Sequence, residues 1–81
     1  MKYKLQLSNK TLKHLKKLDK YQKIEIIKVF QRIVDNPYMF KPLRYELKGY
    51  YRARIGRYRI IFKIDKDIVF IVGIEHRKKA Y

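Results

Sequence analysis

The chain has 81 residues, and its 22 lysines and arginines outnumber its 7 aspartates and glutamates, which gives a formal net charge of +15. This length fits one small domain covering residues 1–81, and a hydrophobic content of 47% is too high for a disordered chain. The charge favours nucleic acid or another acidic partner, whereas the absence of cysteine excludes disulfides and thiolate chemistry.

The sequence carries no predicted targeting or membrane segment. Its first ten residues lack the apolar core of a secretion signal, and no run approaches the roughly 18 apolar residues of a membrane span. The two histidines, His14 and His76, belong to no cluster with metal-ligand spacing. We therefore expect a cytoplasmic protein that has no membrane partner and uses no metal or other cofactor.

A strand followed by a helix is predicted at the beginning of the chain. Apolar residues alternate with polar ones at Tyr3, Leu5 and Leu7, which is the period of a half-buried strand. Ser8 or Asn9 can then cap a helix. The apolar stripe of that helix is expected at Leu12, Leu15 and Leu18.

A second helix is predicted between Asp19 and Asn36. Asp19 followed by Gln22 resembles a capping box, and the residue before Pro37 is pushed out of the helical region. The apolar residues of this helix fall on one broad face: Ile26, Ile27, Val29, Phe30, Ile33 and Val34. Because the link is short, the two helices should form an antiparallel hairpin that packs on one face of a sheet.

A β-hairpin is predicted after a connection over residues 38–50, in which the alternation from Leu43 to Leu47 indicates a short edge strand. The hairpin turns at Gly56-Arg57, because glycine supplies the positive φ that a type II′ turn requires. A two-residue loop fixes the register and places three pairs opposite one another: Ile55 and Tyr58, Arg54 and Arg59, Arg52 and Ile61.

The last predicted strand runs from Ile68 to Ile74 after a turn at residues 65–67, and its nearly continuous apolar sequence suits a central position. Gly73 within it indicates a bulge or a close backbone approach. The fold class is therefore α+β, in the order β-αα-βββ, with an N-terminal helical hairpin packed on a small antiparallel sheet.

One face of the predicted hairpin gathers Arg52, Arg54 and Arg59 within a few ångströms of one another. Like charges directly opposite across a sheet are destabilising, so folding alone does not favour this arrangement. A polyanion bound to the sheet would account for it. The alternative is a solvated polar face whose side chains are basic by chance.

Three motifs follow one another along the second half of the chain. They are Leu47-Lys48-Gly49, Tyr51-Arg52-Ala53-Arg54-Ile55-Gly56-Arg57-Tyr58-Arg59-Ile60-Ile61 and His76-Arg77-Lys78-Lys79-Ala80-Tyr81. In their order and spacing, and with the helical hairpin that ends in Asn-Pro, they resemble the RelE family of the RelE/ParE superfamily of toxins.

The resemblance implies the toxin of a type II toxin–antitoxin system. Toxins of the RelE branch are ribosome-dependent endoribonucleases that cut messenger RNA in the ribosomal A site without a metal and so inhibit translation. The expected partners are the ribosome, messenger RNA and a cognate RelB-like antitoxin with an acidic toxin-binding segment. Two other hypotheses stay open: a ParE-like inhibitor of DNA gyrase, and a non-catalytic basic module that binds nucleic acid.

Carried over position by position, the catalytic residues of the RelE branch fall at Arg52, Arg54, Arg59, Arg77 and Tyr81. Family members often have lysine at the first two positions, where this chain has arginine. Arginine stays protonated, so these residues can clamp the scissile phosphate and stabilise the transition state but cannot accept a proton. The resemblance leaves Tyr81 as the best titratable candidate for proton transfer, with His76 as the second.

Other basic and aromatic side chains are expected to contact RNA around this set. They are Lys48, Tyr50, Arg57, Lys63, His76, Lys78 and Lys79. By alternation Tyr50 lies on the same side as the arginines, where its ring can stack on a nucleobase.

Overall fold

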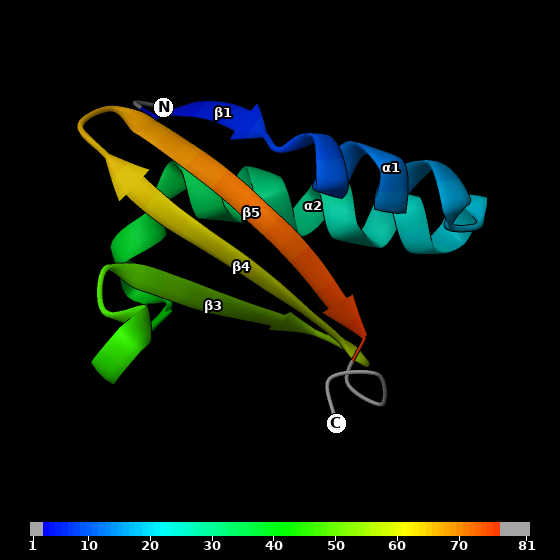
Figure 1. The fold of residues 1–81 in the computed structure, drawn as a ribbon. Helices are drawn as coiled ribbons and strands as arrows, with labels where there is room; N and C mark the ends of the chain where they lie inside the picture. Colours follow the sequence, from blue (N-terminus) through cyan, green and yellow to red (C-terminus); the bar gives the residue numbers. More distant parts are fainter. Residues whose placement is uncertain (1–2, 77–81) are drawn as a thin grey trace.

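The computed structural model describes residues 3–76. Its elements are, in chain order, β1 (Lys4–Leu7), α1 (Asn9–Lys17), α2 (Lys20–Asp35), the 3₁₀ helix η1 (Pro37–Met39), β2 (Lys41–Pro42), the 3₁₀ helix η2 (Tyr45–Leu47), β3 (Tyr50–Ile55), β4 (Tyr58–Asp65) and β5 (Ile68–His76) (Figure 1). The α+β class and the order of the main elements are as predicted.

The strands form one five-stranded sheet in the order β1-β5-β4-β3-β2. β1 pairs with β5 in parallel, while the other neighbours are antiparallel. The sheet is therefore mixed, where the sequence had indicated an antiparallel one. No local pattern marks the β1–β5 pairing, because its two strands are joined through the rest of the fold.

Both helices begin at the caps that the sequence predicts. The Ser8 side chain accepts a hydrogen bond from the backbone N–H of Thr11, and the Asp19 carboxylate accepts one from the N–H of Gln22 at 2.8 Å. α2 ends at Asp35, immediately before Asn36-Pro37. Among residues 3–76, no helix is both long enough and apolar enough to cross a membrane.

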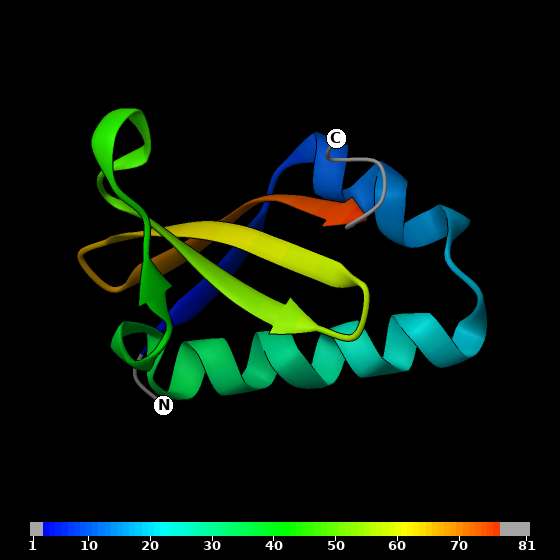
Figure 2. The same cartoon turned by 90° about the horizontal axis from the view of Figure 1, so that it is seen from below.

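The core lies between α2 and one face of the sheet, which leaves the opposite face without a helix across it (Figures 1 and 2). The residues that fill this core are Ile26, Val29, Phe30 and Ile33 of α2 and Ala53, Ile60, Phe62, Val69, Ile71 and Ile74 of the sheet. α1 lies beyond the end of β1, alongside β5, and its Leu15 packs against the same core, so the helical hairpin packs on the sheet roughly as predicted.

Two apolar residues expected on the packed sides of the helices are largely exposed. Leu12 retains 42% of its exposure and Ile27 retains 44%. On α1 the fully buried side chain is Thr11, whose hydroxyl donates to the carbonyl oxygen of Ile71 at 3.2 Å. This hydrogen bond is what allows a polar residue to occupy the buried position next to β5.

The edge strand lies earlier than the alternation from Leu43 to Leu47 predicts. It is the two-residue β2, which pairs with Tyr51 and Arg52 of β3. Tyr45, the first residue of η2, adopts a positive φ of 59°, which is incompatible with an extended strand.

A β-bulge interrupts the pairing of β4 with β5. Ile61 lies opposite Gly73 and Phe62 lies opposite Ile71, which leaves Val72 as the extra residue. As a result Ile71 and Ile74 both face the core. The bulge that Gly73 indicated in the sequence is confirmed, and it decides which way the end of β5 points.

Candidate nucleic-acid interface

The arginines of β3 and β4 lie on the sheet face that α2 does not cover. The predicted register is confirmed, since Arg54 lies opposite Arg59 and Arg52 opposite Ile61. Gly56 turns the chain with a positive φ of 57°, as its place in the turn requires. We call the side of the sheet that carries Arg52, Arg54 and Arg59 the arginine face.

A hollow of about 370 Å³ opens over the arginine face. Its polar lining comes from Arg52, Arg59 and Glu75, together with Lys10 of α1. η2 and α1 flank this side of the sheet, whereas α2 lies on the other side (Figure 2). The hollow is therefore bounded by side chains that are far apart in the sequence, from Lys10 on the first helix to Glu75 on the last strand.

Lys10 and Glu75 are two residues of this hollow that the sequence analysis did not single out. Glu75 reaches the arginine face because the bulge at Val72 shifts the alternation of β5 by one residue, which places Glu75 opposite Arg59. Lys10 lies next to Gly73, where a Cβ would be 3.9 Å from Cε and Nζ of the lysine. The bulge signal at Gly73 was the clue in the sequence to Glu75.

The arginines differ in how far they are withdrawn from solvent. The side chain of Arg59 is only 14% exposed and its Nη2 lies 3.6 Å from Oε1 of Glu75, whose side chain is 48% exposed. Arg54 is exposed and Arg52 is half-buried. A partly desolvated guanidinium attracts an anion more strongly than an exposed one does, because solvent screens it less.

Tyr50 and Lys63 lie on the arginine face, as predicted. They are opposite each other on β3 and β4, and Nζ of Lys63 is 6.0 Å from the centre of the Tyr50 ring and 5.6 Å from that of Phe70. Tyr50 also lines the hollow. Lys48 and Arg57 are exposed, at the end of η2 and in the β3–β4 turn, and neither lines this hollow.

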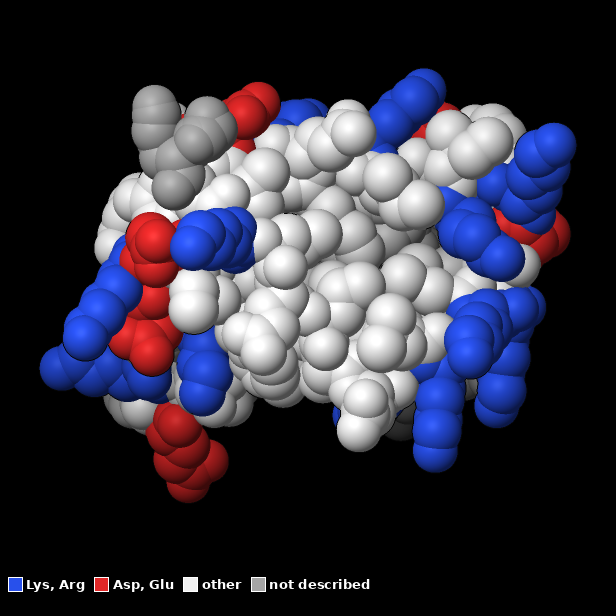
Figure 3. Space-filling model, turned by 90° about the horizontal axis from the view of Figure 1, so that it is seen from above, with Lys and Arg blue, Asp and Glu red and all other residues white. Residues whose placement is uncertain are grey.

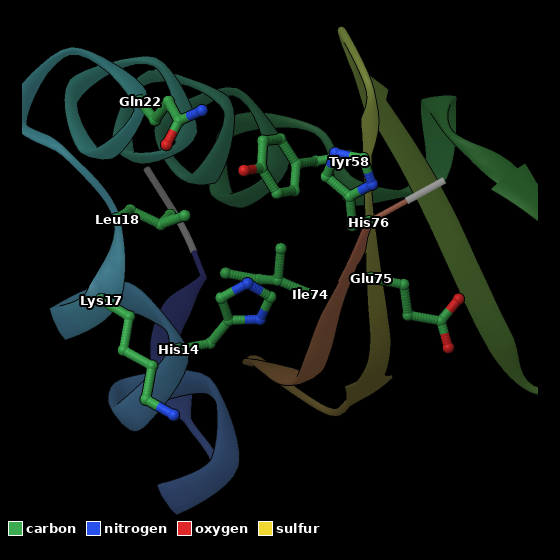
Figure 4. Close-up of a pocket in the computed structure, with 8 residues that line it drawn as sticks. All are labelled: His14, Lys17, Leu18, Gln22, Tyr58, Ile74, Glu75 and His76. Carbon is green, nitrogen blue, oxygen red and sulfur yellow. The ribbon is translucent and has the colours of Figure 1, made fainter. Parts of the chain in front are cut away.

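His76 lies on the opposite side of the sheet from the arginines. Its ring contacts Tyr58 edge-on with centres 5.1 Å apart, and His14 approaches the same tyrosine at 6.2 Å. These three rings line a second pocket of about 450 Å³, and the carboxylate of Glu75 points away from them (Figure 4). The structure thus separates His76 from the arginine face, while Arg77, Lys78, Lys79 and Tyr81 lie outside the described residues.

Charge is unevenly distributed over the surface. Seen from the side of β1 and α1, the basic side chains stand at the two ends of the molecule and a broad area between them carries none (Figure 3). Exposed apolar residues occur on the elements of this side and on α2: Leu5, Leu12, Ile24 and Ile27. The molecule therefore has an apolar surface as well as the basic one.

Residues 5–81 match the family model described as the ParE toxin of the type II toxin–antitoxin system parDE. Putative toxin RelE4 of Methanocaldococcus jannaschii is 30% identical over 76 residues, which is 90% of this chain and 81% of that protein. Toxin RelG of Mycobacterium tuberculosis is 44% identical over 43 residues, covering 51% of this chain and 49% of RelG. The chain belongs to the RelE family of toxins.

Solved structures place this RelE-family toxin in the same fold. A chain of the toxin–antitoxin complex RelBE2 from Mycobacterium tuberculosis has a TM-score of 0.84 and 30% identity, over 95% of this toxin and 100% of that chain. A chain of the archaeal RelE–RelB complex from Pyrococcus horikoshii OT3 has a TM-score of 0.79 over 95% and 97% of the two chains, and at 24% identity it supports the fold alone. The toxin spans about half the length of RelG, the whole of the RelBE2 chain and most of RelE4.

Proposed function

We propose that this toxin is an endoribonuclease that cuts messenger RNA in the ribosomal A site and thereby inhibits translation. The observation that carries the proposal is the pair of arginines, Arg54 and Arg59, held directly opposite each other on an open sheet face. This arrangement costs folding free energy unless an anion lies across it. A phosphodiester backbone supplies such an anion, and the hollow beside the pair gives it room.

The arginines bind and stabilise charge in the proposed reaction. The 2′-oxygen of the nucleotide attacks the adjacent phosphorus, the bond to the 5′-oxygen breaks, and negative charge grows on the phosphoryl oxygens in between. Arg52, Arg54 and Arg59 are placed to donate hydrogen bonds to those oxygens. We assign Arg77 and Tyr81 to the same site, while Lys48, Tyr50, Arg57 and Lys63 would hold the flanking RNA. No metal is required by this scheme.

The remaining residues expected to contact RNA are His76, Lys78 and Lys79. Lys78 and Lys79 would contact RNA close to Arg77, next to which they stand in the sequence. The ring of His76 contacts Tyr58 edge-on, on the side of the sheet away from the arginines, so any contact of His76 with RNA would lie outside the arginine face.

The proposed partner in the cell is an antitoxin that covers both surfaces of the toxin. The similar structures of Mycobacterium tuberculosis and Pyrococcus horikoshii are toxin–antitoxin complexes. An acidic, RelB-like segment would neutralise the basic surface, and its apolar residues would pack on the uncharged area beside β1 and α1. We place the whole chain, as one toxin domain, in the cytoplasm, where ribosomes are found.

A second candidate function is the inhibition of DNA gyrase. The description of the matching family model as a ParE toxin favours it. A third is binding of nucleic acid without chemistry, for which the net charge of +15 suffices. Binding of nucleic acid without chemistry would also use the opposed arginines, so we prefer the ribonuclease because the chain resembles the RelE branch, whose catalytic residues fall at Arg52, Arg54 and Arg59.

The test is to map the ends of a message that is being translated in a purified system with the toxin. We expect new cleavage ends inside the A-site codon that disappear when ribosomes are omitted. The double variant Arg52→Gln/Arg54→Gln should lose about 10²-fold or more in cleavage rate, the usual loss when charge-stabilising donors are removed.

The matched control is Lys20→Gln/Lys28→Gln, which removes two exposed charges from α2 on the other side of the sheet. It should cleave like the wild type, because its arginine face is intact. Intact messages together with trapped gyrase–DNA complexes would favour the second candidate. Intact messages, together with binding of the toxin to any RNA, would favour nucleic-acid binding without chemistry, the third candidate.

A further inference from the structure

The arginine face contains a carboxylate, that of Glu75. Glu75 is opposite Arg59 in the register of β4 and β5, and one nitrogen of Arg59 lies 3.6 Å from one oxygen of Glu75. Both side chains line the same hollow as Arg52. The position follows from the bulge, because without the extra Val72 the alternation of β5 would turn Glu75 toward the core.

An ion pair formed for stability explains this carboxylate only in part. One nitrogen of Arg59 lies 3.6 Å from one oxygen of Glu75, and the side chain of Arg59 is 14% exposed whereas that of Glu75 is 48% exposed, so solvent screens the attraction from the Glu75 side. For a face that binds a polyanion, the carboxylate is also unfavourable, because it repels the phosphates that the arginines attract. Glu75 therefore weakens the binding of phosphates even though its charge compensates that of the partly desolvated Arg59, and proton transfer would give it a use beyond this pairing.

The chemistry lacks one group that the arginines cannot provide. Attack by a 2′-hydroxyl requires an acceptor for its proton, and a guanidinium that is always protonated cannot serve. A carboxylate can. Glu75 is close enough to Arg59 for a phosphate held by this arginine to bring the neighbouring ribose near the carboxylate.

We infer that Glu75 is the proton acceptor of the cleavage reaction, an inference that rests on the proposed ribonuclease function. Glu75 takes the proton of the 2′-hydroxyl as the bond between the 2′-oxygen and phosphorus forms. The bond between phosphorus and the 5′-oxygen breaks, that oxygen takes a proton from water, and the hydroxide so formed removes the proton from Glu75. The products are a 2′,3′-cyclic phosphate and a 5′-hydroxyl, and no oxidant, reductant or metal takes part.

The test is Glu75→Gln, which keeps the size of the side chain but removes both its charge and its ability to accept a proton. The single-turnover cleavage rate on translating ribosomes should fall about 10²-fold or more. Affinity for the ribosome–message complex should stay the same or increase, because a repulsive charge has been removed. A residue that acts only by holding Arg59 in place would lower the rate and the affinity together.

Two further variants complete the experiment. Glu25→Gln on α2 removes a carboxylate that also takes part in one exposed ion pair, with Lys28 at 3.8 Å, and should cleave at the wild-type rate. Glu75→Asp keeps the carboxylate and should recover part of the rate that Glu75→Gln loses.

Equal rates for Glu75→Gln and Glu25→Gln would overturn the inference and leave the proposed function standing. A decrease in both rate and affinity for Glu75→Gln would also overturn it, in favour of a positioning role. The proposed function has its own readout, which is cleavage by the wild-type toxin. An inactive wild type would overturn both.

Discussion

Arg54 and Arg59 put two permanent positive charges at neighbouring positions of one sheet face. Replacing the exposed Arg54 by Gln should therefore move stability and activity in opposite directions. Relief of the repulsion should raise the free energy of unfolding by about 0.5 kcal/mol, while ribosomal cleavage should fall about 10²-fold because a charge-stabilising donor is lost. Urea unfolding and the cleavage assay measure the two effects on the same preparation.

The control for this variant is Lys4→Gln, which removes one charge from an exposed strand position opposite the apolar Ile68. It should change neither stability nor cleavage appreciably. If Arg54→Gln is less stable than the wild type, the repulsion between the two arginines is already compensated within the protein, and no bound anion is needed to explain their arrangement.

Residues could be placed from the sequence wherever a local rule fixed their side of the sheet. Arg52, Arg54 and Arg59 were placed correctly because the two-residue turn at Gly56 dictates the register of the hairpin. Glu75 and His76 could not be placed, since their orientation depends on which residue bulges out of β5. The sequence marked Gly73 as irregular but not the direction in which the strand continues.

Among the elements that the structure describes, the turn between β4 and β5 holds a strained backbone, as Tyr45 of η2 does. Lys66 adopts a positive φ of 58° there, a region in which a residue with a side chain pays about 1 kcal/mol. Lys66→Gly should remove that strain and raise the melting temperature by a few degrees, roughly 4–8 °C for each kcal/mol in a domain of this size. Thermal unfolding monitored by circular dichroism is the measurement.

A lysine-to-glycine substitution in a helix should have the opposite effect on the melting temperature. Lys16 is exposed on α1, where glycine costs about 1 kcal/mol relative to a good helix former. Lys16→Gly should therefore lower the melting temperature. A loss of stability in Lys66→Gly would show that the greater freedom of glycine in the unfolded chain outweighs the relieved strain.

Elements with start and stop signals were predictable, and elements that depend on distant partners were not. Ser8, Asp19 and Pro37 delimit the two helices through contacts within a few residues. The pairing of β1 with β5 joins residues more than sixty positions apart, such as Lys4 and Ile68. Thr11 is buried for a similar reason, because the carbonyl that accepts its hydroxyl belongs to Ile71.

For the molecule as a whole, the charge of +15 and the apolar area beside β1 and α1 predict an antitoxin interface with an electrostatic part and an apolar part. The electrostatic part should weaken with salt, so the dissociation constant should rise roughly tenfold or more between about 0.05 M and 0.5 M salt as the charges are screened. Calorimetry of toxin and cognate antitoxin across this range measures it.

Leu12→Ser separates the apolar part of that interface from the electrostatic part. Leu12 is 42% exposed on α1, so its replacement should weaken binding by the same factor at low and at high salt. A dissociation constant of the wild type that does not change with salt would contradict an acidic toxin-binding segment.

The two edges of the sheet determine whether copies of this protein can join strand to strand. One edge is β1, which is four residues long, and the other is β2, which has two residues, one of them Pro42. Proline lacks the N–H that a further strand would need, and Lys41 beside it repels another copy of so basic a chain. Short, charged and proline-blocked edges oppose aggregation, and the sheet stops growing at five strands.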